Sequence, residues 1–146
     1  MSTDDQRKLI ESFLVHGLHQ ETEIEGIAER LSTKQLIRLS TAVFVEALER
    51  TYADRTPTND EIRTYADHLA ANYGTVDHPV KRLIVEALMR AQNGEIDLVK
   101  ALSVEDLFQH QVLIAHDLFA GLNLNESRLD DFVQGALEYV DQMPSA

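Results

Sequence analysis

The sequence has no cysteine and no tryptophan, and only six glycines and three prolines in 146 residues. Without cysteine there is no disulfide, no thiolate nucleophile and no thiolate ligand for zinc or an iron–sulfur cluster. No apolar run approaches the roughly 20 residues that cross a bilayer, and the chain starts without the basic and then apolar order of a signal peptide. We therefore expect a soluble, cytoplasmic protein with no membrane association.

Basic residues are also scarce. Thirteen Lys and Arg stand against 25 Asp and Glu, a formal net charge of −12. From Glu95 onward, ten acids face only Lys100 and Arg128. Proteins bind nucleic acids and anionic membranes mainly through lysine and arginine, which are scarce here. We therefore expect neither a nucleic acid nor a membrane as a partner. The charge favours a basic protein partner, and the alternative is an acidic surface that only keeps the protein in solution.

Apolar residues recur at helical spacing along the chain, and several glycines and prolines, such as Pro57, Gly74 and Gly94, separate these segments. This pattern predicts one all-α domain over residues 1–146, a compact bundle of six to eight helices with orthogonal or up-and-down packing. We expect Thr33–Ala53, Pro79–Gln92 and Val104–Leu122 at its centre. The other expected helical segments are Asp4–Leu18, a short helix from Thr22, a surface helix ending near Gly74, a turn around Ile96–Ala101, and Glu126–Asp141.

Helix-capping residues stand before several of these segments. In a capping box, a Ser or Thr hydroxyl accepts a hydrogen bond from the backbone N–H three residues later. A Glu at that later position accepts, through its side chain, from the backbone N–H of the Ser or Thr. This spacing occurs at Thr22–Glu25 and at Thr58–Glu61, while Thr56–Pro57 offers another start for the second of these helices. Ser103 and Asn125 are the predicted N-caps of the last two long helices.

The last helical segment separates polar from apolar residues most cleanly. At 100° per residue, its apolar residues fall on one broad arc and its acids on the opposite one. Such a helix docks by one side and displays carboxylates from the other, so we predict that the acidic side binds a partner. The predicted partner-binding residues on this helix are Asp130, Asp131, Gln134, Glu138 and Asp141.

Two residues depart from the pattern of the long segment before it. Gln111 lies within the apolar arc, so it should hydrogen-bond a loop backbone or face an interface. Leu113 lies on the polar edge, and we add it to the predicted partner-binding residues. A second copy of the chain is a further expected partner, a homodimer formed through Val85, Met89 or Leu113.

The best metal-ligand pattern is His16, His19 and Glu23. On an unbroken helix these side chains would project within about 60° of one another, and two imidazoles with a carboxylate suit zinc or iron. Gly17 and the capping box at Thr22 favour a break in the helix at this point. We therefore predict no metal and no cofactor, and keep these three residues as the candidates.

Two other clusters have both a functional and an ordinary explanation. Asp106, His110 and Asp117 share one edge of the long segment, where carboxylates raise an imidazole pKa, although any solvated helix edge looks similar. The Ile27–Leu31 spacing is typical of the first helix of a DNA-binding helix-turn-helix. The later positions do not fit that motif, because Ser32–Thr33 replaces the turn glycine and Arg38 replaces a buried aliphatic anchor.

No phosphate-binding glycine loop, nucleophile elbow or dinucleotide fingerprint occurs in the sequence. The function expected is a non-enzymatic protein–protein interaction module, a regulator, adaptor or inhibitor that presents its acidic C-terminal face to a basic partner. The first alternative is a small helical metal-binding protein or enzyme whose histidines converge in the fold. The second is a DNA-binding or transcription-associated regulator built on the degenerate helix-turn-helix.

Overall fold

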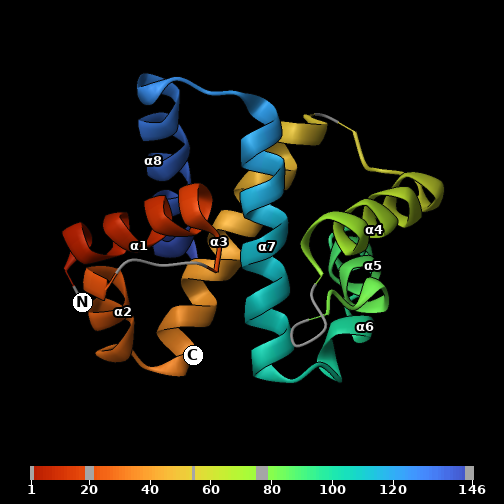
Figure 1. Cartoon of the computed structure of the whole chain (residues 1–146), viewed down its shortest axis with the longest axis horizontal. Helices are drawn as coiled ribbons and strands as arrows, with labels where there is room; N and C mark the ends of the chain where they lie inside the picture. The colour runs from red at the N-terminus through yellow and green to blue at the C-terminus, as the bar shows by residue number, and fades with distance from the viewer. Residues whose placement is uncertain (1, 19–21, 54, 75–78, 144–146) are drawn as a thin grey trace.

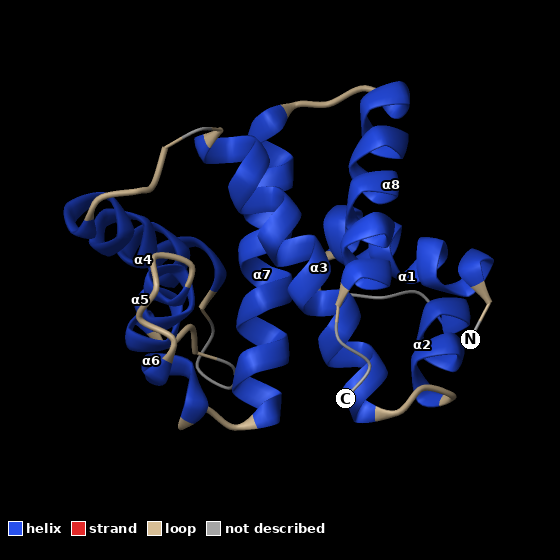
Figure 2. Cartoon of the chain, turned by 180° about the vertical axis from the view of Figure 1, so that it is seen from behind, coloured by secondary structure: helices blue, strands red, loops and turns tan. Residues whose placement is uncertain are grey.

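A computed structural model of the chain describes residues 2–18, 22–53, 55–74 and 79–143, in which it has eight α-helices and no strand (Figures 1 and 2). The prediction of an all-α bundle of six to eight helices is confirmed. The helices are α1 (Thr3–His16), α2 (Thr22–Glu29), α3 (Thr33–Tyr52), α4 (Asn59–Tyr73), α5 (Arg82–Ala91), α6 (Asp97–Lys100), α7 (Val104–Leu122) and α8 (Glu126–Gln142).

Three predicted helix starts are confirmed by their capping bonds. Thr58 Oγ1 accepts from the Glu61 N–H at 3.2 Å, and the Glu61 carboxylate accepts from the Thr58 N–H. The helix α4 therefore starts at this capping box and not at Thr56. Ser103 caps α7 and Asn125 caps α8, each accepting the N–H three residues later. The side chain of Thr22 is outside the described residues, so its capping bond is not described, although α2 does begin at Thr22.

The fifth helix begins later than the sequence predicts. α5 starts at Arg82, not at Pro79, and its N-cap Lys81 makes no side-chain capping bond. The Lys81 backbone N–H donates instead to Nε2 of His110 on α7, at 3.1 Å. This bond to another helix holds the chain extended before α5, which local sequence patterns do not reveal.

α3 and α7 form the centre of the bundle and pack most extensively on each other. α1, α2 and α8 lie on one side of this pair and α4, α5 and α6 on the other (Figure 1). The predicted central position is confirmed for α3 and α7 and is wrong for α5. The reason is that α5 buries only one face, through residues such as Val85, while Leu83 on its other face is 80% exposed.

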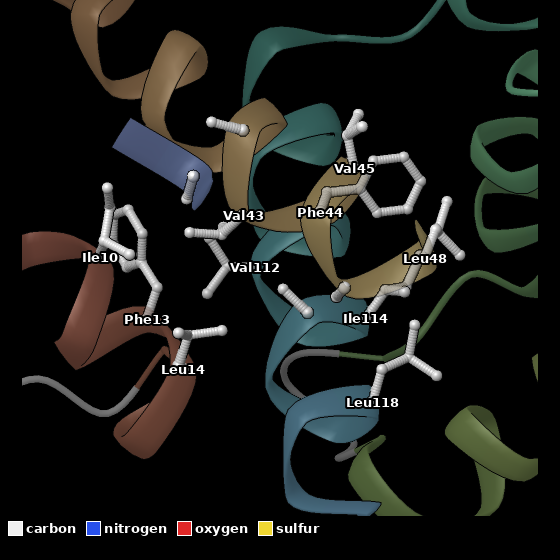
Figure 3. Close-up of a cluster of buried hydrophobic side chains, with 14 of the residues drawn as sticks. Ile10, Phe13, Leu14, Val43, Phe44, Val45, Leu48, Val112, Ile114 and Leu118 are labelled. Carbon is white, nitrogen blue, oxygen red and sulfur yellow. The ribbon is translucent and has the colours of Figure 1, made fainter. Parts of the chain in front are cut away.

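One hydrophobic cluster joins side chains from both sides of the central pair. Phe13 of α1, Phe44 of α3 and Ile114 of α7 are all almost completely buried, and Figure 3 shows the three helices meeting. Val85 and Met89 belong to the same cluster and have no exposed surface. The prediction that they form a dimer surface is therefore wrong.

Gln111 has its hydrogen-bond partners inside the bundle. Its side-chain oxygen accepts from Ser40 Oγ at 2.7 Å and from Thr41 Oγ1 at 3.2 Å, both on α3. Gln111 is 4% exposed, so these two hydrogen bonds are buried between the two central helices. The expectation of a loop backbone or an interface is wrong, because the side-chain oxygen of Gln111 accepts from hydroxyls of the neighbouring helix α3.

Candidate functional site

The C-terminal helix α8 has the two-sided character that its sequence predicts. Its apolar side, including Phe132 and Val133, is buried against α1 and α3. The predicted polar residues are all exposed on the opposite side. We call this surface the acidic face, and its residues are Asp130, Asp131, Gln134, Glu138 and Asp141.

Two arginines border the acidic face without neutralising its carboxylates. Arg7 of α1 donates to Oε1 of Gln134 at 3.0 Å. Arg50 of α3 donates to the backbone carbonyl of Asp131, forms an ion pair with Glu46 at 2.7 Å and lies 5.0 Å from the centre of the Phe132 ring.

The four carboxylates of the acidic face stay without an opposite charge. Among the described residues, none of them forms an ion pair with a lysine or arginine, and only Glu138 accepts a side-chain hydrogen bond, a long one of 3.5 Å from Gln134. Exposed carboxylates gathered on one side of a helix suit charge-dependent binding to a partner of opposite charge.

The end of α8 is attached to the central helix α3. Arg38 donates through Nη2 to the backbone carbonyl of Val140 at 2.8 Å. A cation at a helix C-terminus also interacts favourably with the helix dipole. The residue that replaces the aliphatic anchor of a helix-turn-helix therefore positions α8, while Lys34 is exposed on the first turn of α3. Beyond that turn, α1, α7 and α8 cover most of α3, where a recognition helix needs an open side.

The candidate metal ligands do not share one helix. α1 ends at His16, and Gly17 has a φ of 62°, in the left-handed region that favours glycine. The next helix begins at Thr22, so the unbroken helix that would align the three ligands is absent. His19 and the side chain of Glu23 are outside the described residues. No group of three potential ligands close enough for a metal ion occurs in residues 2–18, 24–53, 55–74 and 79–143.

A pocket of about 510 Å³ lies where the end of α1 and the segment before α5 meet α7. Leu113, a predicted partner-binding residue, is half-buried in its wall. Three histidines also line it, His16 at the end of α1 and His110 and His116 on α7, and sequence spacing cannot show that the two helices meet here. The lining residues are His16, Gly17, Leu18, Tyr73, Pro79, Val80, Glu105, Phe108, Gln109, His110, Leu113 and His116.

Both ring nitrogens of His110 are used by the fold. Nδ1 lies 2.8 Å from the backbone carbonyl of Asp106 and donates to it, while Nε2 accepts from the Lys81 N–H. The Asp106 carboxylate pairs with Nζ of Lys81 at 3.2 Å. Asp117 lies elsewhere, so the predicted edge cluster of Asp106, His110 and Asp117 is not one site. The neutral imidazole of His110 joins α7 to the start of α5.

Burial lowers the pKa of His110 below its usual value, and the nearby Lys81 acts in the same direction against the opposing effect of Asp106. The unfolded chain, with an ordinary histidine pKa near 6.5, then binds more protons than the folded one in mildly acidic solution. We expect the stabilisation by neutral His110 to be present above about pH 6.5 and to be lost as pH falls below it.

Urea denaturation of the wild type and of His110→Gln from pH 7.5 to 5 tests this expectation. The wild type should lose up to about 1.4 kcal/mol per pH unit more than the variant, because one titrating group gives at most that slope. The comparison cancels the contributions of the other histidines and of the acidic surface. Equal slopes for the two proteins would show that His110 is not the group responsible.

His116 fixes the end of α1 to the pocket wall. Its Nδ1 lies 2.7 Å from the backbone carbonyl of Leu14 and donates to it, so Nε2 of the neutral ring is a hydrogen-bond acceptor. The ring also meets that of Tyr73 edge to face, with centroids 6.1 Å apart. Among the described residues, Nε2 has no hydrogen-bond partner.

A polar cluster next to the pocket is centred on Asp117. Its carboxylate accepts from the Tyr65 hydroxyl at 2.7 Å and from the Tyr73 hydroxyl at 2.9 Å, and His68 Nε2 lies 3.2 Å from it. Burial and the Asp117 charge raise the pKa of Tyr73 to about 12 and raise that of Tyr65 further. The sequence places both tyrosines on the stripe by which α4 docks, but it does not reveal their shared acceptor.

The comparisons with known proteins add no family. No family model matches the chain, and no curated protein or solved structure is significantly similar to it. None of the described helices is long and apolar enough to cross a membrane.

Proposed function

We propose that this protein is a non-enzymatic protein-interaction module, a regulator, adaptor or inhibitor, whose acidic face binds a basic protein partner. The observation that carries the proposal is the exposure of four carboxylates on one side of α8, none of them paired with a described cation. The partner contributes lysines or arginines that face these carboxylates. Electrostatic complementarity of this kind speeds and selects association.

The rigid attachment of α8 supports the same proposal. Its apolar side belongs to the core, and Arg38 bonds its last turn to α3. A surface held in place before binding loses less conformational entropy when a partner docks. The acidic face is thus preorganised, unlike a disordered acidic tail.

The test uses protein purified from its native cells at low salt and examined by native mass spectrometry, which also counts the copies in a homodimer. We expect a stoichiometric basic partner that is lost as salt rises, because salt screens exposed charges. Neutralising the face with Asp130→Asn, Asp131→Asn, Glu138→Gln and Asp141→Asn should weaken this complex about tenfold or more, at several tenths of a kcal/mol per charge.

A matched control changes the same number of exposed acids elsewhere, with Glu25→Gln, Glu29→Gln, Glu49→Gln and Glu95→Gln. This control variant should keep the partner, and both variants should keep the helical circular dichroism of the wild type. The proposal fails if no basic partner is present, or if the two variants bind it equally well.

The second candidate function is a small helical metal-binding protein or enzyme whose histidines converge in the fold. The observation that favours it is the pocket lined by His16, His110 and His116. A metal ion requires free ring nitrogens, and His110 has none because both are bonded to backbone groups. The pocket is consequently better suited to an organic ligand than to a metal ion.

A further inference from the structure

The shape of the pocket follows the face of α7. Glu105, Gln109, Leu113 and His116 lie along one side of that helix and all line the pocket. Glu105 and His116 are separated by eleven positions, which is about 16 Å along a helix axis at 1.5 Å per residue. The pocket is therefore long, and its volume of about 510 Å³ is that of typical small-molecule sites.

Between Glu105 and His116, the wall of the pocket on α7 carries the apolar Phe108 and Leu113 together with Gln109 and His110. Leu18 and Val80 from the neighbouring segments add further apolar surface to the lining. Leu18 is 43% exposed although it is a large apolar side chain, so this wall is incompletely covered by the protein itself. A ligand with an elongated hydrocarbon body would cover it, and the removal of this apolar surface from water would favour binding.

The polar groups at the ends are mainly acceptors. Glu105 is exposed at one end and accepts from Gln109 Nε2 at 3.3 Å, which leaves further acceptor positions on its carboxylate. At the other end, His116 offers the lone pair of Nε2. No lysine or arginine is among the described residues that line the pocket. A ligand that fits these ends has to donate hydrogen bonds.

The charge of the site selects among such donors. Glu105 supplies a negative charge at the pocket, and the chain as a whole has a formal net charge of −12, so the field favours a cation and disfavours an anion. We propose that the pocket between α1, α7 and the segment before α5 binds an elongated apolar amine, with its ammonium group at Glu105 and its hydrocarbon body along Leu113. This site is separate from the acidic face and does not depend on the function proposed for it.

The test compares three probes that share one hydrocarbon chain and differ in their head group: n-octylamine, n-octanol and n-octanoate. Isothermal titration with the full-length protein should show at least tenfold tighter binding of n-octylamine than of n-octanol, and no binding of n-octanoate. Glu105→Gln should reduce the affinity for n-octylamine to about that for n-octanol. The matched control Glu126→Gln removes an exposed acid of α8 and should leave binding unchanged.

Location is tested by filling the pocket. Leu113→Trp should abolish binding of n-octylamine, whereas Leu83→Trp on the exposed side of α5 should not. If Leu113→Trp does not fold, the site is located by NMR, from the amide chemical shifts of the wild type titrated with n-octylamine. These shifts should change around Phe108 and Leu113. Absence of binding, shifts elsewhere, or equal affinity for n-octanoate would each overturn the proposal.

Discussion

Replacing Phe44 by alanine should lower the free energy of unfolding by about 3–5 kcal/mol, the usual cost of deleting a buried aromatic ring. Phe44 is 1% exposed and belongs to α3, the helix on which α1, α7 and α8 all pack. Figure 3 shows its side chain among the other buried groups of α3 and α7. The surrounding structure relaxes only partly around such a deletion, and the cavity that remains adds to the cost.

Equilibrium unfolding in urea measures this loss as a lower midpoint at an unchanged slope. Leu83→Ala serves as the control, since that side chain is 80% exposed and its removal should change stability by less than about 0.5 kcal/mol. A loss below about 1 kcal/mol for Phe44→Ala would mean that α3 is not at the centre of the core.

Replacing Asp117 by alanine should destabilise the protein by about 3 kcal/mol, because two tyrosine hydroxyls lose a charged acceptor and hydrogen bonds to charged groups contribute about 1.5–3 kcal/mol each. The Asp117 side chain is 14% exposed, so water replaces it poorly. The loss should be felt between α4 and α7, which these hydrogen bonds join.

The same variant has a spectroscopic signature. Asp117 contributes to the raised Tyr73 pKa through both its hydrogen bond and its charge, whereas burial contributes most. In Asp117→Ala the pKa of Tyr73 should therefore fall from about 12 part of the way toward 10, measured by ultraviolet titration with Tyr73→Phe to assign the signal. Asp130→Ala, which removes an exposed carboxylate, should change neither the pKa nor the stability appreciably. An unchanged titration in Asp117→Ala would contradict the assigned contact.

The sequence predicts those parts of the fold that depend on neighbouring residues. Helical periodicity identifies the long helices, and capping residues locate the starts of α4, α7 and α8. The late start of α5 and its position outside the centre were missed, since they depend on a bond from Lys81 to a distant histidine and on which helices lie beside it.

The candidate sites divide in the same way. The acidic face lies within one helix, so periodicity alone finds its residues, and the structure exposes all five. The pocket combines α1, α4, α7 and the segment before α5, and no spacing along the chain indicates that Leu18, Tyr73 and Leu113 share a wall. The role of Gln111 was missed for the same reason, because its hydroxyl partners are some 70 positions earlier in the chain.

The contacts of α1 with α7 and α8 set an order of events during synthesis. The apolar stripe of Leu9, Ile10, Phe13 and Leu14 is made before α7 and α8, two of the helices that cover it, which begin only at Val104 and Glu126. Domains emerge from the ribosome with the N-terminal end first, and exposed apolar surface in such intermediates promotes aggregation. The nascent chain therefore carries an incompletely covered α1 until α8 has been synthesised, and the burial of this stripe is a late step of folding.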